Sequence, residues 1–453
     1  MAEISASPGS AKKPLNQILG DLIAPVKKVS FASKLWDKLL ILIIIWGTFN
    51  YIHQLQEGLG VTAMRDYSSW GTYIATFVYL VAVSLVGFLI TAVLKLSGIK
   101  WATPITRIAE LVAVAAVMFA GIAIIVDMGR PDRILNIPLH GRFASPIVWD
   151  ITVVNIYLII SLILLYLPMI PDLAILRDKY TDAPKWKRKL YSLLALDWKG
   201  TAEQVKLLHR AEFIMMVVIT PVALAIHTVT SWLFAVNNRT GWDSSIFGPY
   251  FVTGAFVVGT AAVIVAMFVY SKAFKLEKYI TDFHWDKMGK LLVLVSLVYL
   301  YFNINEYLVP GYKLKKLDVA HLNELFVGKD AILFWASQVL GMLLPIVLLI
   351  WKPFRKPLPM TIIAILVVIG AFLKRFLIVV PTQLHPTFPI QNVPEDFMVY
   401  HPTWAEISIT MAVISGVLLV MTLFVRLFPI VPIYETAVEE GHTIESSEAG
   451  HKE

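Results

Sequence analysis

Acidic, basic and imidazole side chains are concentrated between residues 127 and 150 of this chain. Asp127 is followed by Arg130, then by His140 and Arg142, and finally by Asp150. A carboxylate and an imidazole can each accept a hydrogen bond from a hydroxyl group and then take its proton, and burial or neighbouring charges tune how readily they do so. This set of residues is therefore suited to proton-coupled chemistry on a hydroxylated ligand.

Three further residues with suitable chemistry follow later in the chain. His227 lies inside an apolar stretch, and Trp242 and Asp243 come shortly after that stretch ends. With the earlier residues they would provide carboxylate, imidazole and aromatic groups to one site. Whether they meet depends on the elements that carry them.

Ten apolar segments dominate the chain. The mean hydropathy is +0.70, and 16% of the 453 residues are charged, against roughly 25% in soluble domains. A segment of about 20 apolar residues crosses a bilayer, and it must be helical because lipid offers no partners for unpaired backbone groups. The predicted spans are residues 35–55, 70–94, 105–126, 146–167, 208–234, 247–270, 291–309, 331–351, 360–380 and 407–427.

The basic residues fall mainly in every second connection between these spans. The connections on one side, together with the adjoining ends of the spans, hold 27 of the 39 lysine and arginine residues, and the connections on the other side hold 9. An excess of basic residues marks the cytoplasmic side, so both chain ends are predicted to be cytoplasmic and residues 127–150 to be near the outer face. The pI of 9.2 then reflects orientation and contact with the lipid bilayer, and no nucleic-acid partner is expected.

A short internal repeat predicts how the spans are grouped. Trp-Gly-Thr-Tyr at 70–73 and Phe-Gly-Pro-Tyr at 247–250 begin the second and sixth spans, and both spans run inward. We predict an all-α polytopic membrane protein with two tandem four-helix bundles, spans 2–5 and 6–9, flanked by spans 1 and 10; chance similarity between helix starts is the alternative. The predicted units are a cytoplasmic N-terminal tail at 1–34, a flanking helix and loop at 35–69, the two bundles at 70–236 and 237–403, a last flanking helix at 404–434 and an acidic cytoplasmic tail at 435–453.

The residue types limit which cofactors the chain can hold. It has no cysteine, so it cannot ligate an iron–sulfur cluster or attach a c-type haem. Only His53, His209 and His227 lie in predicted spans, so a haem held by paired histidines on facing helices is not expected, and neither is a metal site. Electrons handled by this protein must therefore pass to another subunit.

The residues near the outer face match what a quinol requires. Its ring must lie at the membrane boundary with its tail in lipid, and each hydroxyl needs a partner that takes a proton as the electron leaves. His140 and Asp150 suit this role. The alternative is that His140 and Arg142 only brace a loop, while Asp150 caps a span.

A second polar cluster lies in spans 7–9, where ionisable residues are costly and usually functional. It includes Glu306, Lys374 and Arg375, which are candidates for a proton path or for buried structural ion pairs. Two further proton-path candidates are Asp127 near the outer face and Glu110 near the inner face. Glu110 belongs either to an inward-facing half-channel or to an interfacial ion cluster.

Several short motifs resemble the NrfD/PsrC family of quinone-interacting membrane subunits. They are Gly-Arg-Pro at 129–131, His-Gly-Arg-Phe at 140–143, Trp-Asp at 149–150, His-Thr-Val-Thr-Ser-Trp at 227–232 and Gly-Trp-Asp at 241–243. The resemblance covers roughly residues 35–430. Within the family, the ten spans are most similar to the ActC subunit of bacterial alternative complex III.

The resemblance implies a membrane subunit that oxidises menaquinol or ubiquinol near the periplasmic face of the bacterial inner membrane. Electrons would pass to a periplasmic iron–sulfur subunit and to haem subunits of the c type, beside a homologous membrane subunit, with proton translocation as a further possibility. The family's catalytic residues correspond to His140, Asp150 and Asp243. Arg130, Arg142, His227 and Trp242 would bind the quinol.

Other functions fit parts of the same pattern. One is a paralogous ActF-like subunit with a structural or proton-conducting role. Another is the membrane anchor of a polysulfide- or tetrathionate-type reductase. A secondary transporter also has repeats and buried charges, but transporter folds often use inverted repeats, whereas the repeat here is parallel.

Overall fold

The computed structural model describes residues 13–27, 30–99, 101–388 and 390–442, and within these ranges it contains helices and loops but no strands. Ten of the helical segments are long and apolar enough to cross a membrane, which confirms the predicted all-α class and the number of candidate spans. They are α2 (Phe31–Glu57), α3 (Thr72–Leu96), α4 (Thr103–Asp127), α6 (Pro146–Tyr166), α9 (Ala202–Ala235), α10 (Phe247–Phe274), α11 (Asp282–Lys313), the interrupted segment Ala331–Leu349, α15 (Pro357–Gln383) and α16 (Trp404–Leu427).

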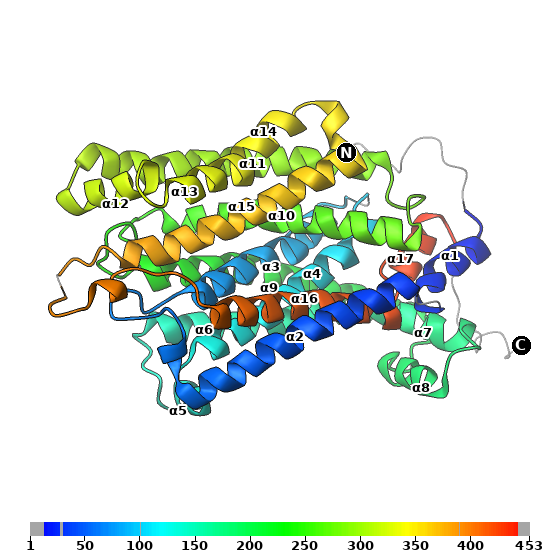
Figure 1. Ribbon diagram of the computed structural model, residues 1–453. Coiled ribbons are helices and arrows are strands. Elements are labelled where there is room, and N and C mark those ends of the chain that lie inside the picture. Colours follow the sequence, from blue (N-terminus) through cyan, green and yellow to red (C-terminus); the bar gives the residue numbers. More distant parts are fainter. Residues whose placement is uncertain (1–12, 28–29, 100, 389, 443–453) are drawn as a thin grey trace, which may run out of the picture.

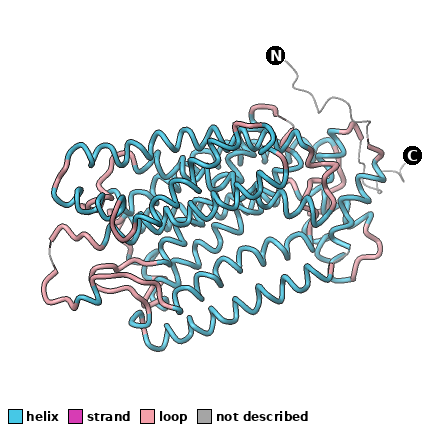
Figure 2. The backbone as a smooth tube through the Cα atoms, turned by 45° about the horizontal axis from the view of Figure 1, so that its top comes forward, coloured by secondary structure: helices cyan, strands magenta, loops and turns pink. Residues whose placement is uncertain are grey.

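Shorter helices lie at the two ends of this bundle. Figure 1 shows α5 and α12 at one end, and α1, α7, α8 and α17 at the other. Figure 2 shows that the loops are likewise collected at the two ends of the helices. The short elements are α1 (Leu15–Lys27), α5 (Asn136–His140), α7 (Met169–Lys179), α8 (Lys185–Leu194), α12 (Lys316–Phe326), α17 (Ile433–Glu439) and the single turns η1 (Leu59–Val61), η2 (Pro131–Arg133), η4 (Lys352–Arg355) and η5 (Glu395–Phe397).

Several helices begin earlier than their apolar segments predict, because capped polar turns precede the apolar residues. Helix α9 starts at Ala202, where the Thr201 side chain accepts a hydrogen bond from the backbone N–H of Gln204. Helix α16 starts at Trp404, after a capping box formed by Thr403 and Glu406. Such caps satisfy N–H groups that the first helical turn leaves unpaired. The added turns extend the helices beyond the apolar spans.

The eighth span has an irregular backbone. It consists of α13 (Ala331–Gln338), a π-helical turn η3 (Val339–Leu343) and α14 (Leu344–Leu349). Pro345 lies two residues after the end of the π turn. A proline lacks the N–H that a regular helix would use, and it crowds the carbonyl four residues earlier. The wider turn accommodates this proline. It also brings Gly341 against Gly370 of α15.

Replacing Gly370 by alanine is expected to destabilise the protein by about 1–3 kcal/mol, the usual cost of overpacking a core. A Cβ atom at this position would lie 2.4 Å from the backbone N of Gly341, and backbone cannot move aside cheaply. The matched control is Gly121→Ala on α4, where a Cβ meets nothing within 4 Å. Thermal unfolding midpoints of the two variants test this, and equal midpoints would contradict the close helix contact.

Helices α3 and α10, which carry the two repeated motifs, lie at the centre of the molecule. Helix α3 contacts α4, α9, α10 and α15, and α10 contacts α9, α11 and α15 as well. Helices α3, α4, α6 and α9 contact one another in one half, while α10, α11, α13, α14 and α15 do so in the other. Helix α2 packs on α16, which contacts α3 and α4.

The two ends of the described chain meet at one end of the bundle. The backbone N–H of Lys13 donates to Glu440 at 3.4 Å, and the His442 ring lies 2.7 Å from the Lys13 carbonyl oxygen. An even number of membrane crossings is required for this contact. The predicted acidic tail begins within α17, and residues 443–453 lie outside the described residues.

The N-terminal segment at this end of the bundle folds more than the sequence pattern predicts. The sequence predicts a tail over residues 1–34, but the described part of that range contains α1, in which Ile18 and Leu22 are buried. The apolar residues of α1 recur with helical spacing, a signal that a search for long apolar spans overlooks. In the loop after the fourth span, residues 185–194 form the helix α8, anchored by the buried Tyr191.

Candidate functional site

Asp150 is buried one turn inside α6. Its side chain is 2% exposed, and Oδ1 accepts a 2.5 Å hydrogen bond from the Thr230 hydroxyl of α9. A carboxyl group at this depth is expensive to bury and needs compensating partners. A single hydrogen bond from a hydroxyl offsets only part of this burial cost, so the carboxyl group is well suited to take up a proton.

His227 lies one helical turn before Thr230, on the same face of α9. Its side chain is 2% exposed, and neither ring nitrogen has a hydrogen-bond partner among the described residues. Buried polar atoms without partners are rare, and each one suggests a missing ligand or water. Asp150 and Thr230 thus form a buried polar pair between α6 and α9, and His227 lies one turn earlier on α9. We call these three residues the α6–α9 cluster.

The loop before α6 lies outside this cluster. His140 is exposed at the end of α5, and Arg142 and Phe143 beyond it are also exposed. Within the described residues no hydrogen bond joins His140 to Asp150, so the structure does not bring the expected pair into direct contact. The physical reason is that Asp150 lies within the helix bundle, where Thr230 reaches it, whereas α5 is a surface helix.

Arg130 is likewise engaged away from the cluster. Its guanidinium forms two hydrogen bonds with Asp132, at 2.9 and 2.8 Å, and both side chains are more than half exposed. Asp127, at the end of α4, is half-buried and its Oδ1 has no partner among the described groups. Neither residue contacts Asp150.

Trp242 and Asp243 are adjacent in sequence but differ in their surroundings. Trp242 is buried, donates from Nε1 to the Ile378 carbonyl oxygen at 2.7 Å, and packs against Trp70 and Phe234. It therefore braces α15 against the first half of the molecule. Asp243 is exposed, and its charge helps to raise the pKa of Asp318, a shift caused first by the burial of Asp318.

The second cluster contains two buried cations that lie against aromatic rings. The Lys374 ammonium donates to the Tyr307 hydroxyl and lies 4.4 Å from the centre of that ring and 5.7 Å from that of Tyr250. Arg375 lies over Phe251 at 5.1 Å. Cation–π contacts stabilise such charges in place of ion pairs. Neither cation forms a salt bridge within the described residues, but Glu306 lies near enough to Lys374 to attract its charge.

Glu306 completes this cluster on α11. Its Oε2 accepts a 2.7 Å hydrogen bond from the Ser244 hydroxyl. Next to it, the Tyr250 hydroxyl donates to Asn303 at 3.1 Å, and Asn303 donates to Gln338 at 2.8 Å. The polar interior of this half therefore contains a hydrogen-bonded chain, Tyr250–Asn303–Gln338, and a separate Glu306–Ser244 pair.

Glu110 is buried near the other end of the bundle, where an ion pair joins Lys95 to Glu435 at 2.8 Å. On α9, His209 lies 3.7 Å from Glu212. These groups are typical of an interfacial ion cluster, which is one of the two alternatives that the sequence leaves open for Glu110.

Sequence reasoning missed a buried carboxylate at the start of α16. Glu406 is fully buried and accepts hydrogen bonds from the Tyr400 hydroxyl and from the backbone N–H groups of Ala63 and Thr403. The Thr-x-x-Glu sequence at 403–406, which is typical of a capping box, could have revealed it. Sequence reasoning also missed Asp318 and His321. They lie on α12, outside the apolar spans, so hydropathy did not indicate that they are buried.

A model of the family described as "Polysulphide reductase, NrfD" matches residues 60–387, well over half of the chain. The chain belongs to the NrfD family. The matched range begins after α2 and ends before α16, so it contains both polar clusters described above.

Proteins similar to this chain are named as subunits of redox enzymes. A selenate reductase component from Mesobacillus selenatarsenatis is 26% identical over 410 residues, which is 88% of this chain and 94% of the relative. The menaquinone reductase integral membrane subunit of Nitratidesulfovibrio vulgaris is 23% identical and covers 88% of this chain and 92% of its own length. An Hdr-like menaquinol oxidoreductase integral membrane subunit of Archaeoglobus fulgidus is 22% identical, over 86% of this chain and 91% of its own.

Proposed function

We propose that this multi-pass membrane protein is the quinol-binding subunit of an oxidoreductase complex. The observation that carries the proposal is the α6–α9 cluster in a member of the NrfD family. The names of two relatives support it, because one is a menaquinone reductase subunit and the other a menaquinol oxidoreductase subunit. Menaquinol is accordingly the favoured substrate, ahead of ubiquinol.

The chemistry divides between the chain and its partners. Asp150 takes a proton from a quinol hydroxyl, breaking that O–H bond and forming a carboxyl O–H bond, and His227 offers a second buried acceptor. The two electrons leave to a partner subunit, because this chain has no cysteine for a cluster. An iron–sulfur subunit is the proposed acceptor, with c-type haem subunits beyond it in a complex of the alternative complex III type.

His140, Arg142, Arg130 and Asp243 have a different role in this proposal. They are exposed, so they belong to the surface at which a quinol or a partner subunit would arrive. The even number of spans and the distribution of basic residues support an outer location for this surface. Closure of the α5 loop over Asp150 in the assembled complex would bring His140 to the quinol.

The membrane anchor of a terminal reductase is the second candidate. The relative named as part of a selenate reductase favours it, since such a complex would pass quinol electrons to a soluble oxidant. Both candidates use the same quinol site. They differ in the partner that accepts the electrons.

Purification of the intact complex from native membranes is expected to yield bound quinone together with iron–sulfur protein. Quinone would be identified by solvent extraction, and quinol oxidation would be followed optically with a water-soluble analogue. Haem subunits in the preparation would favour the alternative complex III type, and a large catalytic reductase subunit would favour the anchor. A chain that purifies alone and retains no quinone would contradict the proposal.

A further inference from the structure

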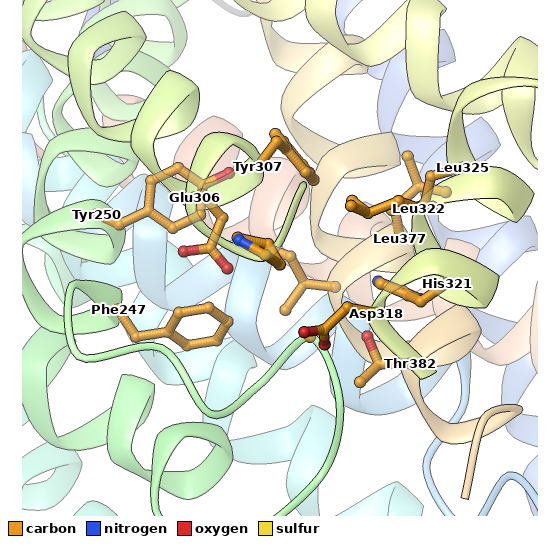
Figure 3. A pocket seen from close by; sticks show the side chains of 13 residues that line it. Phe247, Tyr250, Glu306, Tyr307, Asp318, His321, Leu322, Leu325, Leu377 and Thr382 are labelled. Carbon is orange, nitrogen blue, oxygen red and sulfur yellow. The ribbon is translucent and has the colours of Figure 1, made fainter. Parts of the chain in front are cut away.

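A small cavity lies beneath α12, at the end of the second half of the molecule. Its volume is about 40 Å³. Figure 3 shows the carboxyl groups of Glu306 and Asp318 and the imidazole of His321 around this space, with Thr382 beside them. The remaining walls are aromatic and aliphatic, and come from α10, α11, α12 and α15.

One polar atom in the wall has no partner. His321 is 7% exposed, and its Nδ1 forms no hydrogen bond among the described residues. The other ring nitrogen, Nε2, faces the backbone at Gly241. A buried nitrogen left unpaired costs about 1–3 kcal/mol. The cavity exceeds the roughly 10–15 Å³ that one water molecule needs, and its polar groups provide the two to four partners that buried water requires.

Two of the carboxyl groups that line the cavity lie at different depths relative to the membrane. Glu306 lies within the membrane-spanning helix α11 and is held by Ser244. Asp318 lies on α12, which is outside the spans, and Asp243 is near enough to help raise the pKa of Asp318. The cavity thus connects a carboxyl group at membrane depth with one at the end of the bundle.

The charged groups around the cavity favour uptake and release of protons. Burial and the neighbouring His385 lower the pKa of His321 to about 4, so at neutral pH it has one donor and one acceptor nitrogen. Burial raises the pKa of Asp318, although Lys315 and Lys313 oppose the shift. Lys374 of α15 donates a hydrogen bond to Tyr307, whose side chain forms part of the cavity wall. Glu324 is already paired with His385 and Lys329.

We propose that this cavity holds water and exchanges protons between Glu306 and the solvent at the α12 end of the bundle, with Asp318 and His321 holding the water chain in place. The Glu306 O–H bond breaks as a water takes the proton, this water passes one of its protons to the next water, and that water releases one to the Asp318 carboxylate or to solvent. No electron moves in this step. The inference goes beyond the proposed function, because it requires neither a quinol nor a partner subunit.

The test uses the full chain in lipid nanodiscs and measures hydrogen–deuterium exchange at the Glu306 carboxyl group by infrared spectroscopy. The carboxyl C=O band that disappears in Glu306→Gln identifies this group. After a jump into D2O, the band is expected to shift at least tenfold more slowly in Asp318→Asn and in His321→Phe than in the unaltered protein. The matched control is Glu395→Gln, an exposed carboxyl at the same end of the bundle.

A cavity-filling variant keeps the test decisive if removal of a polar group disturbs folding. Thr382→Leu places apolar atoms where the water would lie, and it is expected to slow the exchange as strongly. Unchanged exchange in all three variants would overturn the proposal, and so would the absence of a Glu306 carboxyl band between pH 4 and 9. Loss of quinol oxidation would leave these exchange rates unchanged, so failure of the proposed function is a separate outcome.

Discussion

Replacing Asp150 by asparagine is expected to lower quinol oxidation by the assembled complex by about 10²- to 10⁴-fold, the usual contribution of a positioned acid or base. The amide keeps the size of the side chain and can still hydrogen-bond to Thr230, so the complex is expected to assemble normally. It cannot take a proton from a quinol hydroxyl. Steady-state oxidation of a quinol analogue, with electron transfer to the partner, measures the effect.

Two threonines on α9 provide a matched control for this prediction. Thr230 donates to Asp150, whereas the Thr228 hydroxyl donates only to the Leu224 carbonyl oxygen of its own helix. We expect Thr230→Val to lower the rate and to alter its pH profile, and Thr228→Val to leave both unchanged. An Asp150→Asn complex with full activity would remove Asp150 from the mechanism.

Replacing Asp172 by asparagine is expected to lower the free energy of unfolding by about 3–5 kcal/mol, the usual cost of breaking a buried ion pair. Asp172 and Arg107 are 0% and 1% exposed and lie 2.5 Å apart. Arg107 also donates to the carbonyl oxygens of Pro168 and Pro429, and Asp172 accepts from the N–H groups of Ile433 and Tyr434. The pair therefore joins α4 and α7 to the start of α17.

An exposed ion pair on the same protein is the appropriate control. Lys272 and Glu277 lie 3.2 Å apart with about half of each side chain exposed, and such surface pairs contribute about 0–1 kcal/mol. Thermal unfolding in detergent or nanodiscs is expected to show a large fall for Asp172→Asn and little change for Glu277→Gln. Equal midpoints for the two variants would contradict a structural role for the buried pair.

The positions of the ten spans were predictable because each depends on local sequence. A helix in lipid satisfies its own backbone, so about 20 apolar residues are enough to specify it. The helix ends were less predictable, since Thr201 and Thr403 extend α9 and α16 by capping polar turns outside the apolar windows. Helix α1 was missed because it is short and amphipathic.

The α6–α9 cluster was only partly predictable. The sequence alone marked Asp150 and His227 as polar residues at membrane depth, because burying such groups is costly wherever they lie. The partner of Asp150 is Thr230, which is 80 residues away and became a neighbour only when α6 packed against α9. The exposure of His140 depended on the direction in which α5 leaves the bundle.

By itself the sequence determined that this protein is a ten-span helical membrane protein with two polar clusters, since hydropathy and helical period act over a few neighbouring residues. Only the tertiary structure decided which polar groups meet. It placed Lys374 among aromatic rings, left the nitrogens of His227 without partners among the described residues, and put His321 over a cavity shared with Glu306. The physical reason is that these contacts join residues distant in the chain, and helix packing rather than local pattern selects them.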